Sequence, residues 1–279
     1  MKLTSLGMGA MIALAGITAA AVQAATIVPG SVVTANVTGS GQSSVTTGAA
    51  YSQFINPDTV VVVGAAWEAK NNLDITSISW AGQSFSQVVG TASTTRENPT
   101  QNYTESEYWI AKPELGAISG ALTVTWNAAT SEANDVLFIT IQTIQKVAGE
   151  ARGSAGGSNY NTTITQPVAT TASGELVLSL FVHGAASAST VASSSTPGAA
   201  TVIVNDVKPG IAGLFESITS VADNSGLTSH TYTVASTQGG PAYSSLSVSV
   251  LAFPVPEPTS LSLLAVGAAG LLLRRRKTA

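Results

Sequence analysis

A run of four valines at residues 60–63, continued by Gly64-Ala65-Ala66-Trp67, constrains the fold of this chain more than any other stretch. Valine is β-branched and favours a strand over a helix. A segment that is apolar at every position has no polar side to turn toward water. Residues 59–67 therefore predict a strand that is apolar on both faces, as in the centre of a sandwich.

Further strand-like segments follow along the chain, with turn signals between them. Residues 120–126 alternate, with Leu122, Val124 and Trp126 on one face and Thr123 and Thr125 on the other. We expect further strands at residues 75–80, 84–89, 104–111, 136–144, 162–169, 175–183, 200–207, 210–221, 230–235 and 246–253. No helical period accompanies them. The pattern predicts an all-β fold, an antiparallel β-sandwich of the jelly-roll type.

Several local expectations follow from the same pattern. Residues 91–103 are polar and contain a proline, which predicts a long surface loop. Residues 149–160 are rich in glycine and predict the most flexible internal stretch. Ser247 and Ser249 alternate with valines and are expected to face outward. A last expectation concerns three tryptophans that lie among alternating apolar residues, which favours core packing over a carbohydrate platform: Trp67, Trp80 and Trp126.

The last 26 residues, 254–279, comprise a proline-rich spacer, an apolar run and a basic end. Pro254, Pro256 and Pro258 remove backbone donors, so the spacer is neither helix nor central strand. Residues 261–273 carry no charge and would rise about 20 Å as a helix. Residues 259–277 can cross a thin membrane if the basic side chains snorkel, and the basic end would stay on the cytoplasmic side.

The tail resembles the PEP-CTERM sorting signal of Gram-negative bacteria. The resemblance rests on Val255-Pro256-Glu257-Pro258, the apolar helix and Arg274-Arg275-Arg276. It implies export in bacteria that make extracellular polysaccharide, and recognition by an exosortase, a membrane protease that cleaves near Pro-Glu-Pro. The helix would then be a transient anchor, and whether the tail is cleaved or retained stays open.

A second targeting segment is expected at the N-terminus. Lys2 precedes an apolar stretch, and Val22-Gln23-Ala24 offers the small residues that a signal peptidase selects. We expect Sec export and cleavage after Ala24, with Ala25 as the alternative. The predicted organisation is a signal peptide at 1–24, a β-sandwich domain at 25–253 and a sorting signal at 254–279.

The charge of the predicted domain limits its partners. Setting the two ends aside leaves 6 of the 11 Lys and Arg and 14 of the 15 Asp and Glu, a net charge near −8. This charge argues against nucleic acid and anionic lipid. Charged residues are only 9% of the chain and cysteine is absent, which is typical of an exported β protein whose surface carries hydroxyls and which has no disulfides.

Glu105 and Glu107 are the strongest candidates for ligand contact. They lie two residues apart on a predicted strand, so they share a face with Trp109. Two carboxylates at this spacing fall in the range of a glycosidase pair, and the aromatic ring could carry a sugar. The alternative is an exposed polar strand face, with Tyr108 and Ile110 directed to the core.

Other candidate chemistry is weaker. His183 and His230 are the only histidines, and no Gly-x-Ser-x-Gly elbow accompanies them in the mature chain, so no catalytic residue is predicted. No metal site is predicted either. Calcium in Asx-rich turns stays open as an alternative; these turns are residues 71–74, 134–135, 205–206 and 223–224.

The predicted domain also resembles an uncharacterised module of secreted bacterial proteins, in the segments 60–64, 80–85, 107–109 and 120–126. That resemblance implies fold and not activity. We expect a non-enzymatic cell-surface or extracellular matrix protein, structural or adhesive, in association with extracellular polysaccharide, as in a biofilm matrix. The alternatives are a carbohydrate-active enzyme and a calcium-dependent carbohydrate-binding module on a jelly roll.

Overall fold

The computed structural model describes residues 28–38, 42–47, 50–96, 103–129, 136–145, 151–159, 163–167, 176–185, 189–196, 201–207, 215–223, 229–236 and 244–253. All of them belong to one compact unit, Ala25–Pro256. The predicted signal-peptide cleavage at Ala24 or Ala25 and the predicted sorting tail lie outside the described residues.

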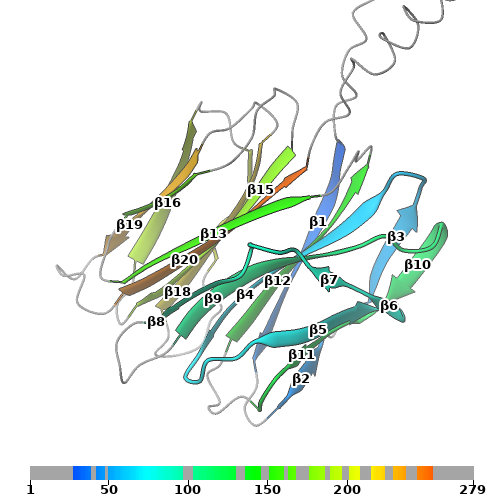
Figure 1. Ribbon diagram of the computed structural model, residues 1–279, viewed down its shortest axis with the longest axis horizontal. Coiled ribbons are helices and arrows are strands. Elements are labelled where there is room, and N and C mark those ends of the chain that lie inside the picture. The colour runs from blue at the N-terminus through cyan, green and yellow to red at the C-terminus, as the bar shows by residue number, and fades with distance from the viewer. Residues whose placement is uncertain are drawn as a thin grey trace, which may run out of the picture. The chain divides into compact units, whose positions relative to one another are not determined.

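Strands from both halves of the described chain build the sheets (Figure 1). The central sheet has the order β1 (Val28–Thr38), β12 (Val136–Gln145), β4 (Val60–Ala69), β9 (Tyr103–Ala111) and β7 (Ser86–Gln87), and β8 (Ser93–Arg96) also pairs with β9. The front sheet has the order β2 (Ser44–Thr46), β11 (Leu122–Trp126), β5 (Ile75–Trp80) and β6 (Gln83–Ser84). Beside it, β3 (Tyr51–Ile55) pairs with β10 (Gly116–Gly120).

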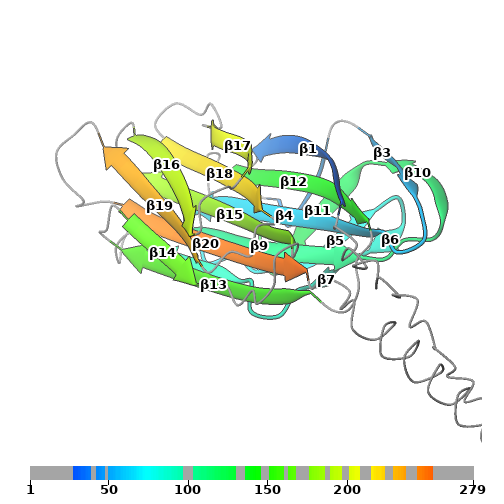
Figure 2. The same ribbon diagram turned by 90° about the horizontal axis from the view of Figure 1, so that it is seen from above.

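Two further sheets come mainly from the second half of the chain. The back sheet has the order β13 (Arg152–Asn159), β20 (Ser244–Phe253), β15 (Leu176–Ala185), β18 (Phe215–Asp223) and β17 (Thr201–Val207). The outer sheet consists of β14 (Thr163–Pro167), β19 (Ser229–Ser236) and β16 (Ser189–Thr196), and it contacts the back sheet (Figure 2).

The predicted fold class is confirmed. The described residues contain strands and no helix, and neighbouring strands in the sheets pair antiparallel, for example β4 with β9 and β12. The sheets stack face to face as in a β-sandwich, with the central sheet covered on both sides. The jelly-roll connectivity stays a prediction.

Strand β4 lies at the centre of this arrangement, as the valine run predicts. All ten of its residues are buried. Val61, Val63 and Trp67 face the front sheet, whereas Val60 and Val62 face the back sheet. Successive side chains of a strand point to opposite faces, so a strand that is buried at every position has cover on both sides.

The front core holds the tryptophans. Trp67, Trp80 and Trp126 are buried, as predicted, and Trp109 joins them. The Trp80 indole N–H donates to the backbone oxygens of Tyr51 at 3.1 Å and Gly120 at 3.0 Å. These two acceptors belong to β3 and β10, so one buried side chain ties the small sheet to the front sheet.

Hydroxyl groups join the central sheet to the back sheet. Ser249 Oγ donates to Thr91 O at 2.5 Å and lies 2.7 Å from Ser106 Oγ. Ser247 Oγ donates to Thr104 O at 2.7 Å. The expectation that Ser247 and Ser249 face outward is wrong, because the central sheet covers the serine side of β20 and leaves both residues 0% exposed.

Two expected loops are also corrected. Residues 91–103 do not form a surface loop throughout, because β8 lies within them and Thr91, Ser93 and Thr95 are buried. Residues 149–160 contain β13, which pairs with β20 along its whole length. In the N-terminal region, β1 and β2 are edge strands of the central and front sheets.

Replacing Ser249 by alanine tests the contact between the sheets. The change leaves Thr91 O and Ser106 Oγ without a buried partner, so we expect the free energy of unfolding to fall by about 1–3 kcal/mol. Urea unfolding of the full chain measures the loss. Ser119→Ala, at an exposed hydroxyl, is the matched control and should change stability by less than about 0.5 kcal/mol. Equal losses in the two variants would contradict the role of this contact.

Candidate functional site

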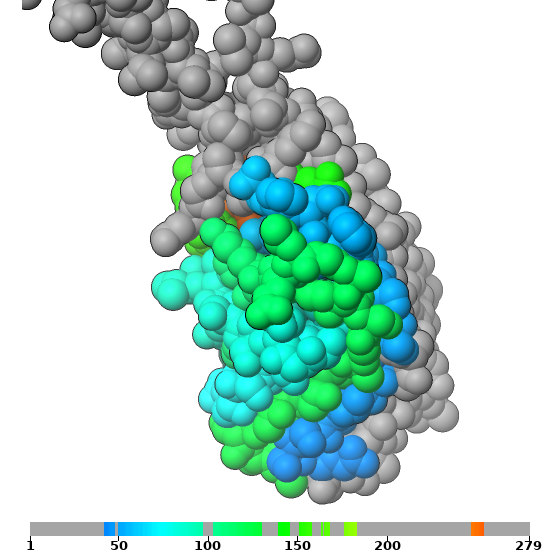
Figure 3. Space-filling view, turned by 90° about the vertical axis from the view of Figure 1, so that its right-hand side faces the viewer, coloured from blue at the N-terminus to red at the C-terminus, as the bar shows by residue number. Residues whose placement is uncertain are grey.

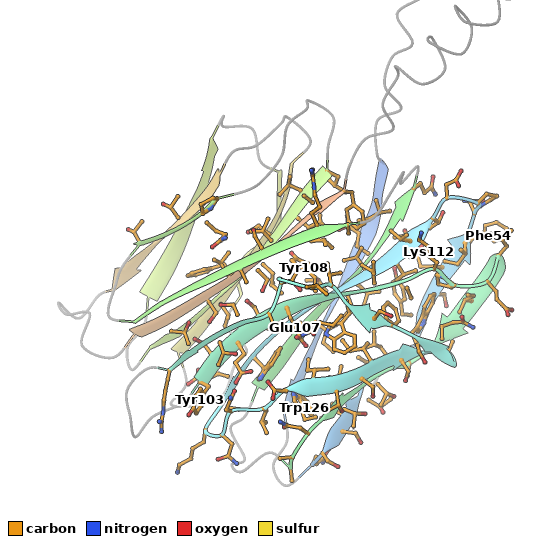
Figure 4. All side chains as sticks on the ribbon, in the orientation of Figure 1. Phe54, Tyr103, Glu107, Tyr108, Lys112 and Trp126 are labelled. Carbon is orange, nitrogen blue, oxygen red and sulfur yellow. The ribbon has the colours of Figure 1, made fainter. Side chains whose placement is uncertain are left out.

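Glu105 and Glu107 lie side by side on β9, as predicted, and both side chains point into the front core. Their exposed fractions are 2% and 3%, and that of Trp109 is 6%. Figure 4 shows Glu107 on β9 with Tyr108 next to it. Tyr108 points the other way, into the core between the central and back sheets. Strand β9 is therefore covered on both faces, and the carboxyls meet apolar side chains.

The carboxyl oxygens have neutral hydrogen-bond partners. Glu107 Oε1 accepts from the Trp109 indole N–H at 2.6 Å, and Oε2 accepts from the side-chain amide of Gln87. Glu105 Oε1 accepts a weak bond from the backbone N–H of Leu73 at 3.4 Å. Each of these donors is uncharged, so it provides a carboxyl oxygen with a hydrogen bond but would not neutralise the negative charge of an ionised glutamate.

Burial controls the ionisation of both groups. It raises the pKa of Glu105 from 4.5 to about 9, against a smaller lowering by the Leu73 N–H. Burial also raises the pKa of Glu107 from 4.5 to about 7, partly offset by the bonds from Trp109 and Gln87. The negative charge of Asp74 raises both values further. Glu105 is thus a neutral acid at pH 7, while Glu107 titrates near it.

The structure brings the three predicted contact residues together but does not expose them. A ligand reaches Glu105, Glu107 or Trp109 only if a covering element moves, so ligand contact there stays a prediction. The carbohydrate-active enzyme required both carboxyls to line a cleft beside an exposed tryptophan. Among the described residues that condition is not met.

The outward side of the front sheet carries a second candidate site, which we name the hydroxyl face. Its cross-strand pairs align Thr46, Thr123, Ser79 and Ser84 in one row across four strands. A second row joins Ser44, Thr125 and Ser77. These residues are exposed or half-buried, and Thr46 Oγ1 lies 2.9 Å from Thr123 Oγ1. In the lower part of Figure 3 the atoms of β2, in blue, lie beside those of β11, in green.

The sequence predicted part of this face. The alternation of residues 122–126 correctly places Thr123 and Thr125 outward, because Leu122, Val124 and Trp126 are buried. The rows themselves depend on the register of β11 with β2 and β5, which no local pattern reveals. The only available signal was the abundance of serine and threonine in predicted strands.

The remaining candidates contribute no described site. His183 lies in β15 and His230 in β19, each on a strand. Asn205 and Asp206 belong to β17 and not to a turn, because that segment pairs with β18. Asp74 is bound by the side chain of Asn127, whose Nδ2 donates at 3.1 Å. No group of three metal-binding side chains occurs in the described part of the chain.

Comparison with known proteins bears on the tail. A family model described as the PEP-CTERM protein-sorting motif matches residues 254–277. The chain carries a PEP-CTERM sorting motif. It is therefore an exported protein with a membrane-anchored sorting signal, which an exosortase processes. The match contains the predicted motif residues Val255, Pro256, Glu257, Pro258, Arg274, Arg275 and Arg276.

The other comparisons add little about the rest of the chain. No curated protein sequence matches it. A solved structure described as "Crystal Structure of the STIV MCP" is 11% identical, with 79% of this chain and 97% of the other covered and a TM-score of 0.17. A TM-score this low carries no argument about fold or function. None of the described residues belongs to a helix with the length and apolarity that crossing a bilayer requires.

The buried carboxyls make the stability of the fold depend on pH. In the unfolded chain both glutamates ionise near pH 4.5, whereas in the folded chain they retain their protons to about pH 7 and about pH 9. We expect the free energy of unfolding to fall by several kcal/mol as pH rises from about 5 to about 9. Urea unfolding at pH 5, 7 and 9 measures this slope.

Substitution assigns the slope to these residues. Glu105→Gln and Glu107→Gln keep the shape but cannot ionise, so each should flatten part of the pH dependence and stabilise the protein at pH 9. Glu114→Gln, at an exposed position, is the control and should leave the slope unchanged. Stability that rises from pH 5 to pH 9 would contradict the assignment.

Proposed function

We propose that this exported protein is a non-enzymatic structural or adhesive component of the cell surface or extracellular matrix. Its hydroxyl face would bind a neutral extracellular polysaccharide. The arrangement of that face is the observation that carries the proposal. Two rows of serine and threonine hydroxyls cross the front sheet, with neighbouring strands about 4.8 Å apart.

The chemistry of hydroxyl groups favours this class of ligand. Each serine or threonine hydroxyl donates one hydrogen bond and accepts others, as do the hydroxyls of a sugar ring. Many weak polar contacts, direct or through water, then add up along a polymer. The net charge near −8 of the predicted domain favours a neutral polymer over an acidic one.

The export route supports the same proposal. The PEP-CTERM motif marks an exported protein. The resemblance to this sorting signal implies export in bacteria that make extracellular polysaccharide, which is a hydroxyl-rich polymer. Export would use the Sec machinery and signal peptidase at Ala24 or Ala25, and the exosortase would release or retain the tail at the membrane. Surface adhesion needs neither a cofactor nor a catalytic group.

Two isosteric substitutions on β11 test the face. Thr123→Val together with Thr125→Val removes two adjacent hydroxyls, one from each row, without changing side-chain shape. We expect the affinity of the full chain for an immobilised neutral glucan to fall at least about tenfold, measured by binding isotherms. Thr163→Val with Thr165→Val, at exposed positions of β14 in the outer sheet, is the matched control and should bind like the wild type.

The same assay distinguishes the alternatives. Reducing ends released from the glucan would overturn the non-enzymatic proposal and favour the carbohydrate-active enzyme. Binding that disappears when calcium is chelated would favour the calcium-dependent module. Equal affinity of the β11 and β14 variants, or no binding by the wild type, would overturn the hydroxyl face as the binding surface.

A further inference from the structure

Residues 83–89, which we name the strap, pass from the edge of the front sheet to the edge of the central sheet. The strap begins with β6 on the front sheet, where Phe85 N–H donates to Ile78 O at 2.9 Å. It then joins β9 of the central sheet through β7, and Val88 N–H donates to Tyr108 O at 2.9 Å. The side chain of Phe85 is buried in the front core. The strap therefore closes that core at one edge.

A single side chain links the strap to the buried carboxyls. Gln87 Nε2 donates to Glu107 Oε2, while the other oxygen of Glu107 accepts from Trp109. Among the described neighbours of the pair, β4 presents Trp67 and Ala65 opposite the glutamates, and the front sheet contributes apolar side chains. Among the described residues, the charged or titratable groups that act on the pair are the two carboxyls themselves and Asp74.

Water has access to the other side of the strap. A pocket of about 450 Å³ is lined by Ser86, Gln87 and Val88 of the strap, by Ile110 and Phe253 of β9 and β20, and by Lys112, the charged residue of the lining. Val89, at the end of the strap, is 90% exposed. Gln87 thus lies between the pocket and Glu107, so a small displacement of β7 would connect the carboxyl to solvent.

We propose that the strap is a pH-sensitive cover of the front core, closed while Glu107 is protonated and opened when Glu107 ionises. The proton passes to water, and no other bond changes except the hydrogen bonds of the strap. The two donors on Glu107 favour its ionised form, but burial opposes that form more strongly. Opening of the strap hydrates the Glu107 carboxylate and so removes the cost of burying its charge.

Linkage fixes the direction and size of the effect. Closed, the pKa of Glu107 is about 7, and once the carboxyl is hydrated it returns toward 4.5. The open form therefore binds fewer protons at neutral pH, and opening becomes more favourable as pH rises. Between pH 5 and pH 8 the equilibrium constant for opening should increase by about tenfold to a hundredfold.

Hydrogen exchange of the full chain at pH 5 to 8 tests the proposal. After correction for the intrinsic exchange rate, protection of the Phe85 and Val88 amides should fall by about tenfold to a hundredfold across this range. The amides of β11 should stay more protected than those of the strap at each pH, since they exchange through larger openings. Strap amides that match β11 at every pH, or that show no loss of protection, would overturn the proposal.

Two matched variants separate the strap from general stability. Glu107→Gln should remove the pH dependence at Phe85 and Val88, whereas Glu105→Gln should leave it, because Glu105 binds Leu73 and not the strap. Gln87→Met keeps both carboxyls but removes the link, and it should lower strap protection already at pH 5. The assignment would be overturned if strap protection still depended on pH in Glu107→Gln, or if it were unchanged in Gln87→Met.

Discussion

The fold depends on the burial of both faces of the central sheet. All ten residues of strand β4 are buried, so a two-layered sandwich that leaves one face of this sheet to water cannot accommodate it. The front sheet covers one side with a core of large aromatic side chains, and the back sheet covers the other. Because β4 requires both the front sheet and the back sheet, the strands from the second half of the chain share a core with the strands from the first half.

The two interfaces of the central sheet differ in their chemistry. The front one is wide enough for Trp67, Trp80, Trp109 and Trp126. On the back one, a Cβ at Gly64 would lie 2.6 Å from Thr140 Oγ1 and 2.9 Å from Tyr108 Cε1, which explains the glycine after the valine run. Serine and threonine suit this close approach, because they are small and their hydroxyls bond to the backbone across the interface.

The sequence predicts a structural feature when that feature is decided within one strand, and it fails when the feature depends on which other strand or sheet packs against it. The burial of β4 and the alternation of β11 are properties of single strands, and both were predicted correctly. The orientation of Ser247 and Ser249 was not predicted correctly. Alternation defines the two faces of a strand, but it does not tell which of the two faces another sheet covers. The prediction that residues 149–160 are the most flexible internal stretch was wrong for a related reason. A Cβ at Gly153 would clash with the backbone of Val89, so this glycine allows close packing of a strand and does not mark a flexible segment.

The carboxyls of Glu105 and Glu107 show the same limit at the candidate site. Their spacing predicted a shared face correctly, but a strand pattern with two glutamates looks exposed unless the covering layer is known. No described cation lies beside them, so their burial is tolerable only because they can hold protons, and it suits a chain in which charged residues are scarce. The protein is exported, so it meets the pH of its surroundings and not that of the cytoplasm. A buried acid that titrates near neutrality therefore makes the stability of the core depend on pH, in a chain of which only 9% of the residues are charged.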